Sequence, residues 1–244
     1  MQLKEFKIRA SAVSLIMTGQ VGLTEAQENK LKELDKRDQD SAKGLSKPLT
    51  ENMRKELIDL IYKKENPELN QTCISYLQQW IKEQIYGVQK EIKSKYLTKG
   101  LDVEDIAIDY YSEEKGLGFV LKNDQYFSDN FCHGTPDLIH DGIVYDFKSS
   151  WDCFTFPLFD TEPDKPYWMQ LQIYMHLTRL KKAKLVYTLQ NTPDELEWDE
   201  PKDYTDLSSK YRIKEFEFDY DPEFIESVYD RVILCREYIK SLEI

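Results

Sequence analysis

The sequence lacks a hydrophobic run long enough to cross a membrane. No apolar stretch approaches the ~20 residues that a membrane-spanning helix requires. The first residues, MQLKEFKI, are too rich in charge for a secretory signal peptide. We therefore expect a cytoplasmic protein with no membrane partner.

Closely spaced cysteines are also missing. The four cysteines are Cys73, Cys132, Cys153 and Cys235, and no two of them form a C-x-x-C pair. A zinc knot or an iron–sulfur cluster needs such clustered thiolates, so neither is expected. We predict ordinary reduced thiols, most of them buried.

Positive charge is in short supply. The chain has 33 Lys and Arg residues against 45 Asp and Glu residues, a formal net charge of −12. This balance argues against a protein that coats DNA along its whole surface, because phosphate binding depends on Lys and Arg. It does not exclude a local basic region, and Lys90, Lys93, Lys95 and Lys99 cluster beside one acid, Glu91.

The sequence is rich in residues that can form a hydrophobic core. Hydrophobic residues make up 41% of the chain, including 16 Tyr and 11 Phe, which favours a folded α/β protein over a disordered one. Spacing and capping patterns predict a mixed central sheet flanked by helices, with a helical N-terminal extension. The expected helices cover residues 8–17, 24–40, 50–64, 72–95, 102–112, 163–180 and 222–242; the expected strands cover 118–122, 135–140, 143–149, 184–189 and 211–218.

We expect one domain over residues 1–244. Its N-terminal part, 1–97, is predicted to be mainly helical. A core with a meander of strands follows over 98–190. Residues 191–244 are predicted to hold an acidic loop, a strand and a C-terminal helix.

The candidate catalytic residues lie on a predicted hairpin in the middle of the core. Asp141-Gly142 is a strong signal for a two-residue type I′ turn, which requires positive φ at both positions. The turn fixes the register, and counting outward places Asp137 opposite Asp146. Lys148 follows Asp146 by two residues and therefore projects from the same face of the sheet. The other pairs expected are His140 with Ile143, Ile139 with Val144, and Leu138 with Tyr145.

Two directly opposed carboxylates destabilise a sheet unless something offsets their charge. A divalent cation such as Mg²⁺ does so, because it prefers carboxylate oxygens. The Lys148 ammonium group could then aim at an attacking water or at a phosphate group. The hairpin thus predicts a metal site with a cationic neighbour.

These residues resemble the PD-(D/E)xK nuclease superfamily, with its restriction-endonuclease-like core. In that resemblance Asp137, Asp146 and Lys148 take the positions of the motif. The stretch KGLDVEDIA, residues 99–107, looks like the superfamily's G-x-x-x-E motif and would make Glu104 a further acid. Asp105 is the neighbouring alternative, although it lies about 100° around the helix.

Two further motifs resemble RecB-type (YqaJ-like) nucleases and phage lambda-type exonucleases. Gln170 and Tyr174 form a Q-x-x-x-Y motif and share a helix face. The stretch IRAS, residues 8–11, is similar to the start of lambda-type exonucleases, where a basic residue and a Ser bind the DNA 5′ phosphate. Ser11 matches the Ser, and the basic partner is either Arg9 or Lys4.

The resemblance implies a metal-dependent DNA exonuclease. Glu104, Asp137, Asp146 and the backbone carbonyl of Phe147 would hold one or two Mg²⁺ or Mn²⁺ ions. Lys148 would position a water or stabilise the transition state, while Gln170 and Tyr174 would orient the Lys, the scissile phosphate or the terminal base.

The resemblance also implies processive 5′-to-3′ digestion of double-stranded DNA ends in phage-type recombination, inside the host cytoplasm. A single-strand annealing protein would be a partner. A trimeric ring would confine the need for positive charge to its channel. Alternatives are a structure-specific endonuclease of the same superfamily and a non-catalytic DNA-end-binding protein. An iron–sulfur repair nuclease would need the clustered cysteines that are missing here.

Overall fold

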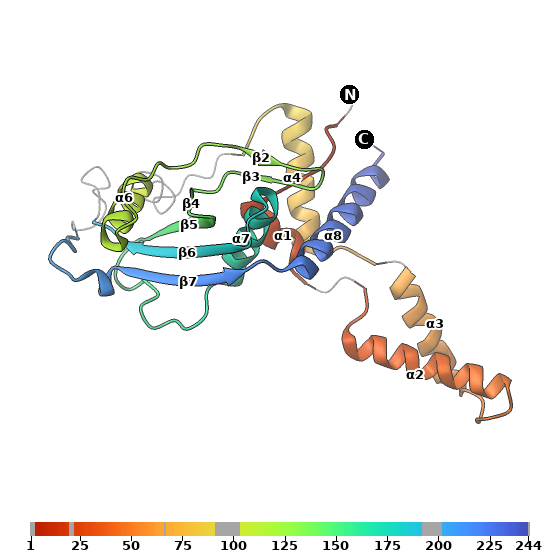
Figure 1. Ribbon diagram of the computed structural model, residues 1–244. Coiled ribbons are helices and arrows are strands. Elements are labelled where there is room, and N and C mark those ends of the chain that lie inside the picture. The colour runs from red at the N-terminus through yellow and green to blue at the C-terminus, as the bar shows by residue number, and fades with distance from the viewer. Residues whose placement is uncertain (1–2, 20–21, 66, 91–102, 192–201, 244) are drawn as a thin grey trace. The chain divides into compact units, whose positions relative to one another are not determined.

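The computed structural model describes residues 3–19, 22–65, 67–90, 103–191 and 202–243. The chain divides into two compact units, residues 1–16 with 79–244, and residues 17–78. Each is described separately below (Figure 1). Whether the whole chain works as one nuclease domain stays a prediction.

The larger unit is built on a four-stranded sheet. Its strands are β4 (Leu138–His140), β5 (Ile143–Ser150), β6 (Lys182–Leu189) and β7 (Ile213–Asp219), in the order β4-β5-β6-β7. β5 and β6 are parallel, and the other two pairs are antiparallel. Parallel neighbours need a crossover, and α7 (Lys165–Thr178) supplies it.

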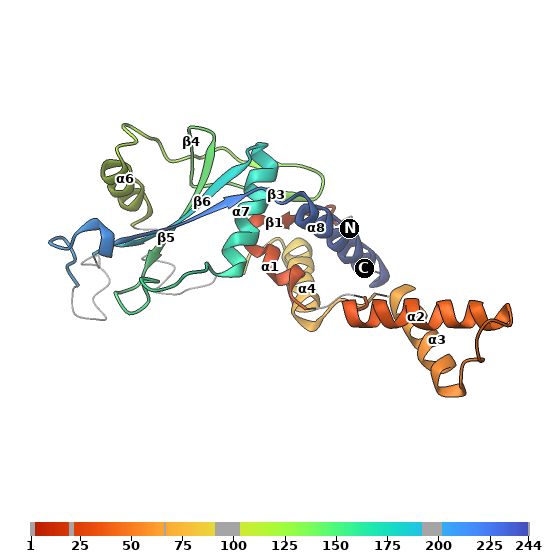
Figure 2. The same cartoon turned by 60° about the horizontal axis from the view of Figure 1, so that its bottom comes forward.

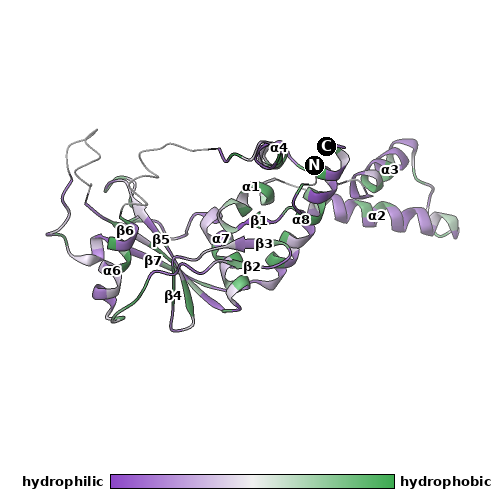
Figure 3. Cartoon of the chain, turned by 90° about the horizontal axis from the view of Figure 1, so that it is seen from above, coloured by the Kyte–Doolittle hydropathy of each residue, from purple (hydrophilic) through white to green (hydrophobic). Residues whose placement is uncertain are grey.

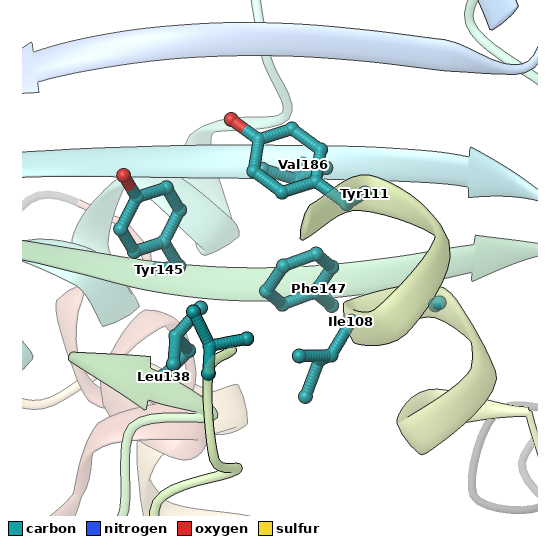
Figure 4. Close-up of a cluster of buried hydrophobic side chains, with 8 residues drawn as sticks. Ile108, Tyr111, Leu138, Tyr145, Phe147 and Val186 are labelled. Carbon is teal, nitrogen blue, oxygen red and sulfur yellow. The ribbon is translucent and has the colours of Figure 1, made fainter. Parts of the chain in front are cut away.

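Helices cover both faces of this sheet. α6 (Glu104–Lys115) packs its buried residues Ile108 and Tyr111 against Tyr145, Phe147 and other apolar side chains, as Figure 4 shows. Successive side chains of a strand alternate between faces, so Asp146 points away from α6. It points toward α7, which contacts β5 and β6. Figure 2 shows both helices beside the strands.

A second, three-stranded sheet brings the start of the chain to α7. It consists of β1 (Ile8–Arg9), β3 (Cys132–Gly134) and β2 (Phe127–Ser128), in the order β1-β3-β2. The short helix η1 (Ala10–Ala12) and α1 (Val13–Met17) follow β1, and η1 packs on α7. The chain ends with α8 (Pro222–Ser241), capped by Asp221, whose side chain accepts the Phe224 N–H at 3.0 Å. The short helix η2 (Ser209–Tyr211) precedes β7.

The smaller unit is helical, as predicted. It contains α2 (Glu25–Ala42), α3 (Glu51–Glu65) and the first half of α4 (Gln71–Tyr86). The predicted capping box opens α2, with Thr24 and Gln27 exchanging hydrogen bonds of 3.0 and 3.2 Å. α2 is mainly hydrophilic (Figure 3), and its buried Leu34 packs in a cluster with Leu23, Leu49, Leu57 and Leu60.

Several predicted boundaries were wrong. Residues 8–17 begin as strand β1 because they pair with β3, and only Val13–Met17 is α-helical. Residues 118–122 form no strand. The helix predicted over 72–95 ends at Tyr86, where Gly87 adopts a φ of +66°. Residues 91–95 of that predicted helix, most of the basic cluster and most of the acidic loop lie outside the described residues. So does the first residue of the helix predicted over 102–112.

The predictions on cysteines and on membrane spans can also be compared with the structure. None of the four cysteines forms a disulfide, and every one except Cys153 is buried, which confirms the expectation of mostly buried thiols. In the part of the chain that the structure describes, no helix has both the length and the apolar character to cross a bilayer.

Candidate active site

The tight turn of the central hairpin forms as predicted. Asp141 and Gly142 have φ values of +48° and +76°, so both are left-handed. The predicted pairs follow in register. They are Leu138 with Tyr145, Ile139 with Val144, and His140 with Ile143.

The ladder ends one pair short of the predicted contact between Asp137 and Asp146. Asp137 instead turns its carboxylate to the edge of β5, where its Oδ2 accepts the Phe147 N–H at 2.6 Å. The next ladder bond would need an N–H from residue 136, which is a proline and has none. Asn123 binds this segment from the other side: its N–H donates to the Asp137 carbonyl and its Nδ2 to the Pro136 carbonyl, each at 2.8 Å.

Because Asp137 leaves the ladder, two oxygen ligands come together at this edge of β5. The N–H and C=O groups of Phe147 point to the β4 side, since antiparallel ladder bonds alternate along a strand. The N–H is held by the Asp137 carboxylate. The carbonyl lies opposite a proline, which cannot donate to it. A carboxylate and a carbonyl oxygen thus occupy neighbouring positions, and both suit a hard cation.

Asp146 is fully buried and held from both sides. Gln170 Nε2 donates to Asp146 Oδ1 at 2.8 Å and lies 3.0 Å from the Tyr174 hydroxyl. Lys148 Nζ lies 2.6 Å from Asp146 Oδ2. Lys148 is therefore the charged partner of Asp146 Oδ2, and this contact acts to lower the pKa of Asp146. The structure therefore brings together Asp146, Lys148, Gln170 and Tyr174, as predicted.

The charges of the site act strongly on one another. Burial raises the pKa of Asp137 to about 8, repulsion from Asp146 adds to this, and Lys148 opposes it. Burial also raises the pKa of Asp146, against the effect of Lys148. Burial acts to lower the pKa of Lys148, but Asp146 and Asp137 overcome this and raise it. Two carboxylates share one ammonium group, and a further positive charge would stabilise their ionised forms.

Glu104 lies at the edge of this cluster. It is the first residue of α6, and its Oε1 forms an ion pair with Lys122 Nζ at 3.1 Å. Its charge raises the pKa of both Asp137 and Asp146. Asp105 binds the same Lys122 at 3.0 Å, but its side chain is 75% exposed and it contributes to neither shift. The geometry favours Glu104 over Asp105 as the acid that faces the site.

The carboxylates are not arranged as a closed metal site. No set of three acidic, His or Cys side chains within the described ranges is placed to hold an ion. Asp137, Asp146 and the Phe147 carbonyl nevertheless offer oxygen ligands of the kind that Mg²⁺ prefers. The raised pKa values of both buried carboxylates also fit a cation, because a positive charge would stabilise their ionised forms.

Three residues missed by sequence reasoning support the site. Tyr167 places its ring 4.9 Å from Lys148 Nζ. Lys122 holds Glu104. Gly134 lies so close to α7 that an added Cβ would come within 2.7 Å of Tyr174 Cε1 and 3.0 Å of the Ala10 Cβ. None of these long-range contacts has a signature in the local sequence, although Tyr167 begins the run that contains Gln170.

The predicted phosphate-binding residues lie in and near the three-stranded sheet. Arg9 is exposed on β1 and pairs in register with His133 of β3. Ser11 is exposed on η1, and Lys4 is exposed before β1. Burial lowers the pKa of His133, and the positive charges of Arg9 and Lys7 lower it further, so these groups form a basic surface. The choice between Arg9 and Lys4 stays open.

Comparison with known proteins gives matches in structure alone. No protein-family model matches the sequence, and no curated protein does. A phage-related exonuclease from Haemophilus somnus 129PT is similar with a TM-score of 0.73 at 21% identity, covering 98% of this chain and 96% of that chain. An alkaline exonuclease, LHK-Exo from Laribacter hongkongensis, has a TM-score of 0.58 at 14% identity over 97% of this chain and 93% of its own.

This chain has an exonuclease fold. A structure of LHK-Exo in complex with dAMP has a TM-score of 0.57 at 16% identity. The exonuclease fold confirms the predicted α/β class and the predicted resemblance in fold, over nearly the whole chain. At these identities the likeness concerns the fold, and the chemistry has to be argued from the residues.

Proposed function

We propose that this protein is a metal-dependent deoxyribonuclease, an exonuclease that hydrolyses phosphodiester bonds at double-stranded DNA ends. One observation carries the proposal: Asp146 meets Lys148 and Gln170 beside Asp137, at the edge of β5 in a chain with an exonuclease fold. A buried pair of acids that share one Lys is costly as a structural device. It is useful where a cation and a phosphate group must meet.

Asp137, Asp146, Glu104 and the Phe147 carbonyl are the proposed ligands for one or two Mg²⁺ or Mn²⁺ ions. When bound, a divalent cation lowers the pKa of a ligated water and offsets the charge of the phosphate. Glu104 is paired with Lys122, so it would have to exchange that partner to act as a ligand.

The chain's own residues have distinct proposed roles. Gln170 fixes the Asp146 carboxylate by donating to Oδ1. Lys148 stays protonated at neutral pH because its pKa is raised, so it can donate a hydrogen bond to the attacking water or to a phosphate oxygen but cannot accept a proton. Tyr174, whose hydroxyl lies beside the Gln170 amide, would act with Gln170 to orient the Lys, the scissile phosphate or the terminal base.

The finer proposals rest on the resemblance. They are 5′-to-3′ polarity, recognition of a 5′ phosphate by Ser11 with Arg9 or Lys4, and a role in phage-type recombination in the host cytoplasm. A single-strand annealing protein and two further copies of this chain in a ring are the proposed partners. A ring fits a net charge of −12, because only its channel would need to be positive.

Digestion of end-labelled linear duplexes tests the proposal. We expect degradation in Mg²⁺, none in chelator, faster decay of the 5′-phosphorylated duplex, and no cutting of closed circular DNA. Lys148→Ala should reduce the rate at least about 100-fold, whereas Lys184→Ala, on the same sheet at an ion pair with Glu215 and Glu217, should not.

The contrary outcomes separate the alternatives. Cutting of the circle would indicate an endonuclease, and binding of DNA ends without degradation would indicate a non-catalytic protein. Full activity of the folded Lys148→Ala variant would refute the site itself.

A further inference from the structure

A second polar pocket lies at the opposite end of α7 from Gln170. It has a volume of about 450 Å³, and β2, the end of α7, the segment before β6 and the β7–α8 junction contribute to it. The proposed catalytic residues lie at none of these positions. Its polar lining consists of Ser128, Asp129, His176, Arg179, Lys181 and Tyr220.

Two exposed cations dominate this pocket. Arg179 ends α7 in a left-handed conformation with a φ of +62°. Lys181 follows two residues later and places its Nζ 3.7 Å from the centroid of the Tyr220 ring. Neither of them forms an ion pair with any residue that the structure describes. Lys7 adds a third positive charge at the rim, where its Nζ donates to Ser128 Oγ at 3.3 Å.

The acid of the pocket is already engaged by donors. Asp129 Oδ1 accepts the N–H groups of Phe131 and Cys132 at 2.7 and 2.6 Å. Its Oδ2 lies 3.1 Å from His176 Nε2 and 2.9 Å from the Tyr229 hydroxyl. A carboxylate with four hydrogen-bond partners is held in place, and its charge is partly offset.

Two acids approach from the side of α8. Burial raises the pKa of Tyr220, and Asp221 and Glu226 raise it further, so both lie near its ring. Asp221 is bound to its own helix as the N-cap, through the Phe224 N–H. Neither Asp221 nor Glu226 belongs to the pocket lining, whereas Arg179 and Lys181 do, and their positive charges favour an anionic ligand.

The position relative to the site points to DNA as the source of that anion. Arg179 follows Gln170 by nine positions, which corresponds to about 14 Å along α7. One strand of a duplex carries a phosphate about every 3.4 Å along the axis, so 14 Å corresponds to about four base pairs. A duplex that lies parallel to α7 with its end at Asp146 would therefore present a backbone phosphate here.

We propose that Arg179 and Lys181 bind a backbone phosphate of duplex DNA about four base pairs from the scissile bond. The proposal rests on the proposed nuclease function, and it adds a second, non-catalytic contact that holds the duplex in place during digestion. A phosphate contact of this kind positions the duplex and carries no sequence information.

Salt-dependent DNA binding tests the pocket. In the Lys148→Ala background, so that the DNA persists, the affinity for a short blunt duplex is measured over a series of salt concentrations. Arg179→Asn removes one charge and keeps a residue that accepts the left-handed conformation. Lys181→Gln removes the other. Lys182→Gln is the matched control. The Lys182 side chain is next to Lys181 in the sequence, is 62% exposed, pairs with Asp219 and does not line the pocket.

We expect Arg179→Asn and Lys181→Gln each to make the slope of log affinity against log salt less negative, and the double variant to reduce its magnitude by about 0.9, the value for one lost phosphate contact. Lys182→Gln should leave the slope unchanged. Unchanged slopes in both pocket variants, or an equal change in the control, would overturn the proposal. So would weaker binding of inorganic phosphate in the pocket variants without a change in DNA binding. Mg²⁺-dependent degradation by the native chain is measured in parallel, so a nuclease without a pocket effect refutes the pocket alone.

Discussion

At the scale of single residues, the hydrogen bond from Gln170 to Asp146 fixes one oxygen of a fully buried carboxylate. Burial raises the pKa of Asp146 and the charge of Lys148 opposes this most strongly, while a hydrogen bond donated to the carboxylate also favours its ionised form. Gln170 also links Asp146 to the hydroxyl of Tyr174. The two residues of the Q-x-x-x-Y motif thus act on the acid from the same face of α7.

Gln170→Leu should therefore weaken metal binding and activity by about 10- to 100-fold, the usual effect of losing a residue that supports a ligand. The measurement is the rate of duplex degradation as a function of Mg²⁺ concentration. Gln172→Leu is the matched control: it is equally buried on α7 but bonds the Asp219 carbonyl and the Asp221 N–H, so it should lower stability and leave the Mg²⁺ dependence alone. Identical Mg²⁺ curves for Gln170→Leu and the native chain would show that the amide does not act through Asp146.

The raised pKa of Asp137 makes a prediction about pH. Its value of about 8 without metal lies far above the ~3.9 of an unfolded Asp. The folded state thus binds the proton more tightly, and the stability of the metal-free protein should fall as the pH rises from about 4 to about 8. A cation needs the deprotonated carboxylate, so its binding must displace that proton below about pH 8.

Mg²⁺ affinity should accordingly rise by up to about tenfold per pH unit below about pH 8 and then level off. Calorimetric titration in two buffers of different ionisation enthalpy measures the affinity and the released proton together. Asp137→Asn should bind Mg²⁺ weakly at every pH and should lose the fall in metal-free stability. An affinity that stays flat from about pH 6 to about pH 9 would contradict the shift.

At the scale of elements, local sequence patterns predicted the turn and the first pairs of the hairpin, but not the point at which its ladder ends. The Asp141-Gly142 turn and the first pairs follow from residue types that tolerate positive φ. The exit of Asp137 from the ladder depends on Pro136 and on Asn123. The proline is visible in the sequence and could have predicted the missing ladder bond. The amide of Asn123 comes from an irregular segment and could not have been foreseen.

Elements held by distant pairing were predicted least well. β1 has two residues and exists because Ile8 and Arg9 pair with Cys132 and His133 more than a hundred residues away. Its apolar spacing alone indicates a helix, and tertiary pairing overrides that preference. Lys122 escaped notice for a similar reason, because its pairing with Glu104 joins a helix start to an irregular segment. Asp146 and Lys148 were predictable as neighbours because residues two apart on a strand project from the same face.

At the scale of the whole molecule, the two ends of the larger unit are bonded to each other. Arg231 of α8 donates to the Ile16 carbonyl, and Arg236 donates from Nε to the Phe6 carbonyl at 3.0 Å. These bonds hold the segment that carries β1 and η1. That segment in turn lies against Gly134 and α7, so the last helix supports the active site through the first strand.

Arg236→Met should test the bonds between α8 and the start of the chain. The substitution keeps the apolar stem and removes the bonds to the Phe6 and Asn130 carbonyls. Charged donors to backbone carbonyls contribute about 1.5–3 kcal/mol, so urea unfolding should show a loss of that size. Glu5→Gln is the control, because it removes only the ion-pair partner of Arg236. The Glu5 side chain is 65% exposed, so this substitution should lower the free energy of unfolding by less than about 1 kcal/mol. If both variants lost the same stability, the contribution would come from the surface ion pair, and the backbone bonds of Arg236 would not be what ties α8 to the start of the chain.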